Sequence, residues 1–284
     1  MGELSYAPFL AGLSGSLAWI LGCAMDWWYT LSGFLVGFIV GVTGVGGGSL
    51  MTPLLVLVFG VAPATAVGTD LMYAALTKMG GSWAHGRRGT VEWRVVVLLA
   101  MGSLPAALAS MALLHYLALD EKHLKTLITS VLSVALVLTA LALLLKPYLQ
   151  KLGRREDGVV YELHAHHLKG ATILTGAVLG VLVTISSVGA GALGVVVLLF
   201  LYPRLPTAKI VGTDIAHAVP LTLVAGLGHA ALGTVNYGLL GNLLLGSLPG
   251  IYLGSHLGVK IPDRILRPIL ATMLIVIGGK LMLS

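Results

Sequence analysis

The sequence predicts an all-α polytopic membrane protein made of two repeats of inverted topology, and three observations support this prediction. First, 57% of the residues are hydrophobic and only 10% are charged, with a mean hydropathy of +0.97, whereas a soluble domain carries about 25% charged residues. Second, many apolar runs approach the roughly 20 residues that a helix needs to cross a bilayer. Third, several short motifs occur twice at one constant spacing.

The predicted spans follow one another along the chain, with short polar loops between them. They are residues 9–25, 64–84, 95–117, 124–146, 207–228, 238–256 and 264–283. Two further apolar regions, 31–59 and 170–201, are interrupted by GVGGGS and SSVGAGA. Each half of these regions holds about 14 to 18 residues, which is short or marginal for a span. We expect each region to form either a helical hairpin or two thin spans.

The charges of the loops predict how the chain is oriented. Basic residues gather in the loops 85–94, 146–169, 202–209 and 256–267, and the other loops are neutral, acidic or mixed. The positive-inside rule places the basic loops in the cytoplasm. Two of them flank the second interrupted region, so the chain enters and leaves that region on one side, which fits a hairpin or two thin spans but not a single broken helix. We expect an inner-membrane protein with a cytoplasmic N-terminus and an external C-terminus.

Four motif pairs share an offset of 144 residues, which indicates an internal duplication. They are VGTD at 67–70 and 211–214, His85 and His229, GTVEW at 89–93 and GTVNY at 233–237, and GSLPA at 102–106 and GSLPG at 246–250. The Gly-rich segments GVGGGSL and SVGAGAL match with a gap of one residue.

The loop charges also predict that the two repeats are inverted. The basic loop near residues 87–94 has an uncharged counterpart at 231–238, so the two loops should lie on opposite sides of the membrane. The predicted parts are an N-terminal transmembrane helix (1–28), a first repeat (29–148), a cytoplasmic linker (149–168) and a second repeat (169–284). Inverted repeats with broken helices are typical of secondary transporters, whose substrate site lies at the repeat interface.

The two Gly-rich segments are the candidate substrate site. A helix that begins after the glycines directs free N–H groups and its positive end toward the membrane centre, which suits an anion. The candidate substrate-binding residues are Thr43, Gly46, Gly47, Gly48 and Ser49 in the first repeat, and Ser186, Ser187, Gly189 and Gly191 in the second. Close helix packing is the alternative explanation for so many small residues.

Four ionisable residues within the apolar segments are candidates for coupling or structural roles. Asp70 and Asp214 occupy matched positions, and each either takes up a proton during transport or accepts hydrogen bonds from N–H groups of the broken helices. Lys78 either neutralises Asp70, attracts the anion, or extends toward the cytoplasmic loop. His217 follows Asp214 by three residues and is either a proton carrier or a packing histidine. His85 and His229 are expected to be interfacial or capping residues.

Several other functions are not expected. No nucleophile–base pair or metal cluster occurs within the predicted spans, so we expect neither an enzyme nor a bound cofactor or metal. His164, His166 and His167 are interpreted as part of a solvated linker. No lysine follows the glycines, which argues against a nucleotide-binding loop. The net charge of +6 is explained by orientation signals rather than by nucleic-acid binding.

The motifs together resemble a known family. GVTGVGGGSLMTPLL and AVGTD, followed by SVGAGALGVVVLLF and IVGTD, are similar to the sulfite exporter TauE/SafE family, also described as 4-toluene sulfonate uptake permeases. The resemblance extends from about residue 29 onward. It implies transport of sulfite, thiosulfate, sulfonates or related small compounds, by proton-coupled exporters in some members and by importers in others.

The resemblance also narrows the expected substrate. Members that take up thiosulfate rely on several pore cysteines, whereas this chain has only Cys23, so a cysteine relay for thiosulfate is not expected. We expect export of sulfite or an organosulfonate by proton-linked alternating access, with one repeat moving against the other in the lipid bilayer. An anion channel, or an importer of a related small organic anion, is the alternative, and the oligomeric state stays open.

Overall fold

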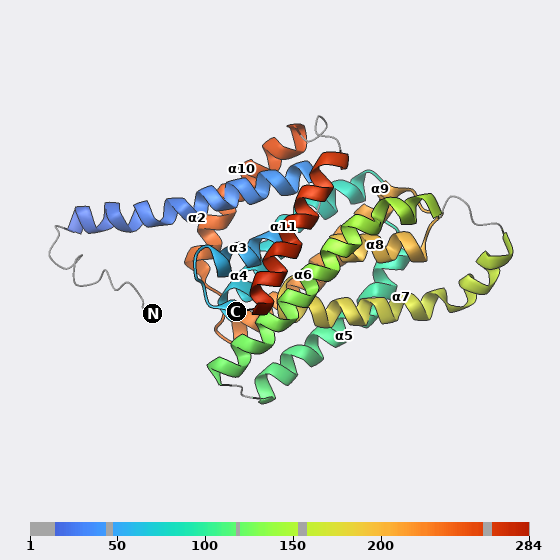
Figure 1. The fold of residues 1–284 in the computed structure, drawn as a ribbon, viewed down its shortest axis with the longest axis horizontal. Helices are drawn as coiled ribbons and strands as arrows, with labels where there is room; N and C mark the ends of the chain where they lie inside the picture. Colours follow the sequence, from blue (N-terminus) through green and yellow to red (C-terminus); the bar gives the residue numbers. More distant parts are fainter. Residues whose placement is uncertain (1–14, 44–47, 118–119, 153–157, 258–262, 284) are drawn as a thin grey trace.

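The computed structural model describes residues 15–43, 48–117, 120–152, 158–257 and 263–283 (Figure 1), and it contains helices and no strand within these ranges. The predicted all-α class is therefore confirmed. The helices are α2 (Gly15–Thr43), α3 (Gly48–Leu57), α4 (Pro63–Arg87), α5 (Trp93–Leu117), α6 (Glu121–Leu152), α7 (Gly158–Ser186), α8 (Ala192–Leu201), α9 (Thr207–Ala231), α10 (Tyr237–Leu257) and α11 (Asp263–Leu283).

Four stretches of the described helices are long and apolar enough to cross a membrane. They are Trp93–Leu117, Lys122–Tyr148, Leu168–Ser186 and Thr207–Ala231. Three of them agree with the spans predicted in α5, α6 and α9. The stretch in α7 is longer than expected, because its 19 residues exceed the short half-span predicted for this region. The predicted span at 64–84 is helical as part of α4, but its polar and glycine residues make it less apolar than the other four.

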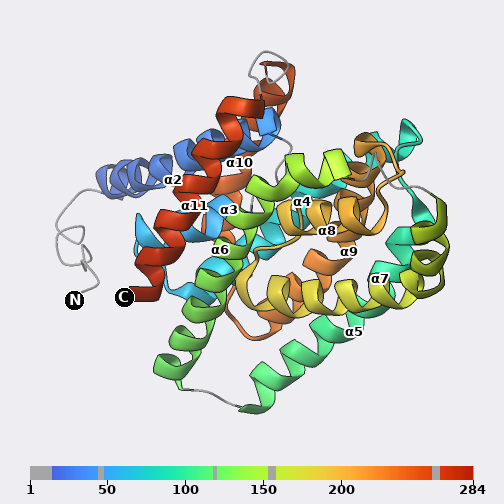
Figure 2. The ribbon, with the colours of Figure 1, turned by 45° about the vertical axis from the view of Figure 1, so that its right-hand side comes forward.

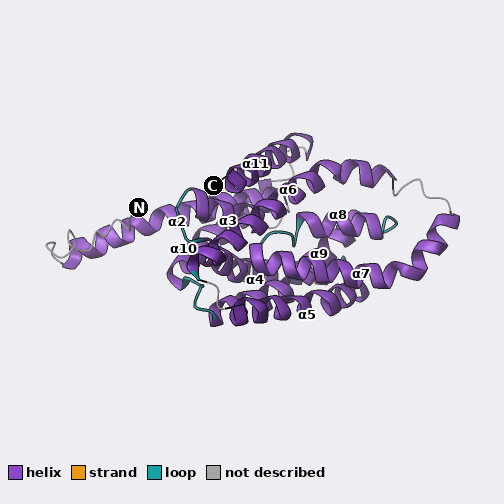
Figure 3. Ribbon diagram, turned by 60° about the horizontal axis from the view of Figure 1, so that its bottom comes forward, coloured by secondary structure: helices purple, strands orange, loops and turns teal. Residues whose placement is uncertain are grey.

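The second interrupted region forms a helical hairpin with one long and one short arm. α7 ends at Ser186, five residues form a turn, and α8 then returns alongside α7 (Figures 1 and 3). The turn needs left-handed backbone at three residues, Ser187 (φ 59°), Gly189 (φ 128°) and Gly191 (φ 134°). The two glycines adopt this conformation at little cost. The 10 residues of α8 extend about 15 Å, or half the hydrocarbon thickness of a bilayer.

Two expected boundaries fall inside helices. α2 is continuous from residue 15 to residue 43, so the boundary expected at residue 28 lies within it, and the described part of the N-terminal helix continues into the first repeat. α6 extends to Leu152 and α7 begins at Gly158, so helix ends occupy most of the predicted linker. The division into domains and the inversion across the membrane stay predictions of the sequence.

Helices of different repeats pack closely through glycines. α10 lies along α2, and α5 lies along α7, with α4 and α9 between these two pairs (Figure 2). A Cβ atom placed on Gly102 of α5 would lie 1.9 Å from the Ile173 carbonyl oxygen of α7. A Cβ atom on Gly246 of α10 would lie 1.8 Å from the Thr30 oxygen of α2. Gly102 and Gly246 are 144 residues apart, and their partners Thr30 and Ile173 are 143 residues apart. The matched glycines therefore make the same contact in both helix pairs.

The VGTD motifs also contact the opposite repeat. The Thr69 hydroxyl accepts a hydrogen bond from the Asn236 N–H at 3.0 Å, and the Thr213 hydroxyl accepts one from the Glu92 N–H at 2.9 Å. Each threonine of one repeat thus holds the start of a helix in the other repeat. Both Thr-Asp pairs are buried where α4 packs on α9.

Candidate functional site

Asp70 is fully buried in α4 and is bonded to the short helix of its own repeat. The Thr52 hydroxyl of α3 donates a hydrogen bond to Asp70 Oδ2 at 2.5 Å. Asp70 Oδ1 has no hydrogen-bond partner among the described residues. The carboxylate therefore connects α4 to α3 through the Thr52 hydroxyl, and the backbone of Thr52 also interacts with it. Bonding to N–H groups of the broken helices stays one of its two predicted roles. Thr52 was not among the candidate residues, although its place one turn after the Gly-rich segment puts it near the predicted site.

Asp214 occupies the matching position in α9, but its carboxylate is not bonded. The residue is 1% exposed, and neither carboxylate oxygen has a partner in the described part of the chain. A Cβ atom on Gly194 of α8 would lie 1.8 Å from Asp214 Oδ1. The carboxylate therefore lies against the first turns of α8, in a space that exists because residue 194 is glycine.

Lys78 crosses from the first repeat to the hairpin of the second. Its Nζ donates a hydrogen bond to the Ala190 carbonyl at 2.9 Å, so the side chain does not extend to the cytoplasmic loop. Its ammonium is also close enough to Asp214 and Asp70 to attract both carboxylates, Asp214 more strongly. The offset of 144 residues places Thr222 at the corresponding position of α9. The cation is therefore a feature of one repeat alone.

The turn between α7 and α8 presents unbonded N–H groups. Among the described residues, none accepts a hydrogen bond from the N–H groups of residues 189–193, while the Gly194 and Val195 N–H groups bond to carbonyls within the hairpin. The Ser187 hydroxyl is buried and directed toward Asp70, but it has no partner at full hydrogen-bond geometry among the described residues. The Ser186 hydroxyl is engaged in the turn itself, because it donates to the Leu182 carbonyl and accepts from the Val188 N–H.

The first Gly-rich segment is described only at its edges. Gly46 and Gly47 lie outside the described residues. Thr43 ends α2, while Gly48 and Ser49 begin α3, but their exposure and contacts lie outside what the structure describes. The predicted contribution of this segment to the site stays a prediction.

His217 of α9 contacts α5, and only one of its ring nitrogens has a partner among the described residues. Its Nε2 is 2.8 Å from the Ser103 hydroxyl of α5, while Nδ1 is buried without a partner among the described groups. Ser103 was not among the candidates, although the repeated GSLP motif contains it. The same offset places Tyr73 opposite His217 and Ser247 opposite Ser103, so the sequence could have indicated this pair.

His85 and His229 lie in the last turns of α4 and α9 and make matching contacts with residues just beyond these helices. Each ring Nδ1 contacts the hydroxyl of the threonine five residues later, at 2.8 Å for Thr90 and 2.9 Å for Thr234. Each of these hydroxyls also donates to the carbonyl of the same histidine. His229 Nε2 contacts the Thr184 carbonyl at 2.9 Å, so both of its ring nitrogens are engaged.

These residues form one polar cluster within an apolar protein. It contains the Lys78 ammonium, two buried carboxylates, the free Ser187 hydroxyl and the N–H groups of the turn. An ammonium has three donors, and only one is used in the bond to Ala190. The described residues contain no group of three His, Cys, Asp or Glu side chains that could hold a metal ion. The cluster is equipped to bind a small anion through N–H donors and to exchange a proton at a carboxylate.

Comparisons with known proteins identify the family of the chain. The family described as "Sulfite exporter TauE/SafE" matches residues 29–281. The chain is 39% identical to the probable membrane transporter protein YjnA of Bacillus subtilis, over 88% of this chain and 97% of that protein. It is 30% identical to a probable membrane transporter protein of Xylella fastidiosa, over 81% of this chain and 84% of the relative. No solved structure matches the chain. The chain belongs to the sulfite exporter TauE/SafE family and is a multi-pass membrane transporter.

Proposed function

We propose that this protein exports a small sulfur-containing anion, sulfite or an organosulfonate, across the inner membrane by alternating access. One observation carries the proposal: the Lys78 ammonium is bonded to the Ala190 carbonyl in the turn before α8, and the N–H groups of residues 189–193 in this turn have no acceptor among the described residues. The description of the family supports the substrate class, and it also supports export as the direction.

The turn supplies what a small oxyanion requires. The N–H groups at the start of α8 point away from the helix, and the helix adds the positive end of its dipole. Two of the three Lys78 donors remain for the anion's oxygens. In an apolar surrounding these donors attract an anion more strongly than they would in water. The matching residues Gly46, Gly47, Gly48 and Ser49 would complete the site from the first repeat.

Charge balance connects anion binding to a proton. Asp70 and Asp214 together carry two negative charges against one positive charge on Lys78, so the cluster opposes an incoming anion until one carboxylate takes up a proton. We place this proton on Asp214, because neither of its oxygens is bonded, whereas Asp70 already accepts a bond from Thr52. The remaining ionisable side chain near Asp214 on α9 is His217.

The same charge balance favours import as a second candidate function. If a proton and an anion bind together, thermodynamic linkage requires that each strengthens the binding of the other. An inward proton gradient would then drive the anion inward, while an inside-negative membrane potential drives an uncoupled anion outward. Export therefore requires either release of the proton before the anion moves or an outward anion gradient larger than the opposing proton gradient.

A flux assay in proteoliposomes tests the function. Sulfite flux should saturate with concentration and respond to an imposed pH gradient. Flux that is linear in concentration and indifferent to pH identifies a channel. Net accumulation of sulfite inside vesicles with an acidic exterior and right-side-out protein identifies import in place of export.

Matched variants test the site. Gly191→Leu should abolish flux, because a side chain at this left-handed position obstructs the turn. Gly233→Leu is the control, since Gly233 also has a positive φ (72°) but open space around it. Full flux in Gly191→Leu and in Gly47→Leu would remove the proposed site.

A separate variant tests the proton site. Asp214→Asn should keep anion exchange while losing its pH dependence, and an unchanged pH profile would exclude Asp214 as the proton site.

A further inference from the structure

A cavity separate from the transport cluster lies at the other end of the short helix α3. It has a volume of about 830 Å³ and is bounded by the end of α3, the loop 58–62, the start of α4, the N-terminal half of α6 and the end of α11. This volume is within the range of ordinary ligand pockets, about 300–1,000 Å³. Neither the transport mechanism nor the family description assigns it a role.

The polar lining of this cavity comes from one face of α6. Lys122, Lys125, Thr126, Thr129 and Ser130 line it, and their spacing of three and four residues places them on one side of the helix. The lining contains no acidic residue among the described positions. The Thr129 hydroxyl is buried there without a hydrogen-bond partner. The cavity therefore offers two positive charges to an incoming group.

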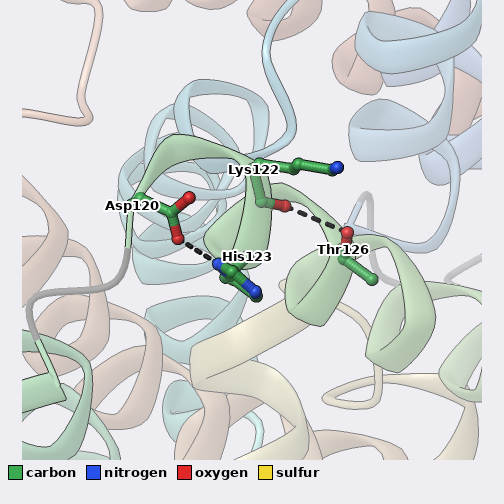
Figure 4. Close-up of polar contacts among 4 residues, drawn as sticks. All are labelled: Asp120, Lys122, His123 and Thr126. Atoms are coloured by element: carbon green, nitrogen blue, oxygen red, sulfur yellow. Dashed lines mark hydrogen bonds and ion pairs between the residues drawn. The ribbon is translucent and has the colours of Figure 1, made fainter.

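The nearby acidic residue is directed elsewhere. Asp120 is hydrogen-bonded to His123, and Figure 4 shows both side chains on one side of the first turn of α6, with Lys122 extending away from them. The hydrogen bond with His123 lowers the pKa of Asp120 below its ordinary value of 3.8, so this carboxylate stays charged and paired at neutral pH. It does not neutralise the lysines of the cavity.

Polarity decreases with depth along the cavity. The two lysines lie at the start of the apolar stretch Lys122–Tyr148, the hydroxyl residues follow within two turns, and Val134 lies one turn deeper. The opposite wall is apolar and includes Val56, Leu57, Leu281 and Met282. From Lys122 to Val134 the helix rises about 18 Å, which takes the cavity from the membrane boundary well into the hydrocarbon region.

We propose that this cavity binds an anionic phospholipid of the surrounding bilayer, with its phosphate on Lys122, Lys125 and Thr126 and an acyl chain along the apolar wall. Basic pockets between transmembrane helices hold anionic head groups on the cytoplasmic side of membranes, and the same attraction acts at this cavity, which the loop charges place on the external side. A small oxyanion would leave the apolar depth of the cavity unfilled, whereas a lipid matches both its charged mouth and its apolar interior. The proposal is independent of the transported substrate and of the transport direction.

Lipid titration of the purified full-length protein tests the proposal. The probes are dioleoyl phosphatidylglycerol, dioleoyl phosphatidylcholine and inorganic phosphate, and binding is followed by native mass spectrometry and by the thermal unfolding midpoint in detergent. Phosphatidylglycerol should bind more tightly than phosphatidylcholine, and phosphate alone should not raise the midpoint. Each lysine near a membrane surface contributes about 1 kcal/mol toward anionic lipid, so Lys122→Gln with Lys125→Gln should weaken phosphatidylglycerol binding about 30-fold.

Two further variants make the test decisive. Lys169→Gln with Lys280→Gln removes the same charge from exposed lysines outside the cavity and should leave binding unchanged. Thr126→Phe keeps both lysines but obstructs the mouth of the cavity beside them, and it should also weaken phosphatidylglycerol binding. Equal affinity for the two lipids, equal loss in both lysine pairs, or protection by phosphate alone would each overturn the proposal. An unchanged circular dichroism spectrum and an unchanged elution profile in detergent without added lipid show that the variants are folded.

Discussion

The close contact between α5 and α7 gives a stability prediction that can be worked out from distances. In Gly102→Ala the new Cβ would lie 1.9 Å from the Ile173 carbonyl oxygen and 2.7 Å from the Ala177 nitrogen. Both are backbone atoms of α7, so no side chain can rotate away. Ordinary contact begins at 3.4 Å, which means that the two helices must separate locally by about 1.5 Å, a shift typical of overpacking.

The expected magnitude follows from two opposing terms. Overpacking of this kind costs about 3 kcal/mol when backbone must move, and replacing a helical glycine by alanine recovers about 1 kcal/mol. Gly102→Ala should therefore be destabilised by about 2 kcal/mol. The control is Gly241→Ala within α10, where a Cβ meets nothing within 4 Å, and it should be stabilised by about 1 kcal/mol.

Thermal unfolding in detergent, followed by circular dichroism, measures the difference. The two variants should differ by about 3 kcal/mol, or about 6 to 12 °C in midpoint. Gly246→Ala repeats the test in the second helix pair, where the distance to the Thr30 oxygen is 1.8 Å, and it should behave as Gly102→Ala does. If Gly102→Ala and Gly241→Ala unfold at the same temperature, the described proximity of α5 and α7 is wrong.

Three further predictions concern contacts near the helix ends. Thr213→Val removes the acceptor of the Glu92 N–H and should lower the unfolding free energy by about 1 kcal/mol, which an unchanged midpoint would contradict. Lys209→Gln breaks a half-exposed ion pair with Glu92 at 3.5 Å and should change stability by less than about 1 kcal/mol; a larger loss would argue against this interpretation. His123→Ala should raise the lowered pKa of Asp120, measured by carboxyl NMR. Because that pKa is lowered in the folded protein, the contribution of the pair is present above pH 3.8 and is lost as the pH falls further.

Much of the fold can be predicted from the composition and from the spacing of the repeated motifs, because every residue of a helix contributes to both. Low charge content predicts membrane helices, and the offset of 144 residues predicts which glycines and threonines make matching contacts. The same offset relates Tyr73 to His217. Comparison of the motifs alone did not reveal this pair, because the two side chains differ.

The site was less predictable, because its contacts join distant parts of the chain. The bond from Lys78 to Ala190 spans 112 residues, and local helix geometry indicated only Asp70 as a neighbour. Asp70 and Asp214 have the same sequence context, yet only Asp70 is bonded. The difference arises because α3 presents Thr52 to its carboxylate, whereas α8 presents Gly194.

The glycine contacts have a consequence for how the molecule moves. α2 belongs to one repeat and α10 to the other, and the same is true of α5 and α7. Backbones packed this closely resist sliding, because any shift brings Cα atoms into collision. The rigid bodies of a transport cycle are then expected to be these mixed pairs, each assembled from both halves of the sequence. The moving units would then not coincide with the two sequence repeats. The motion would take place at α4 and α9, which lie between the two pairs.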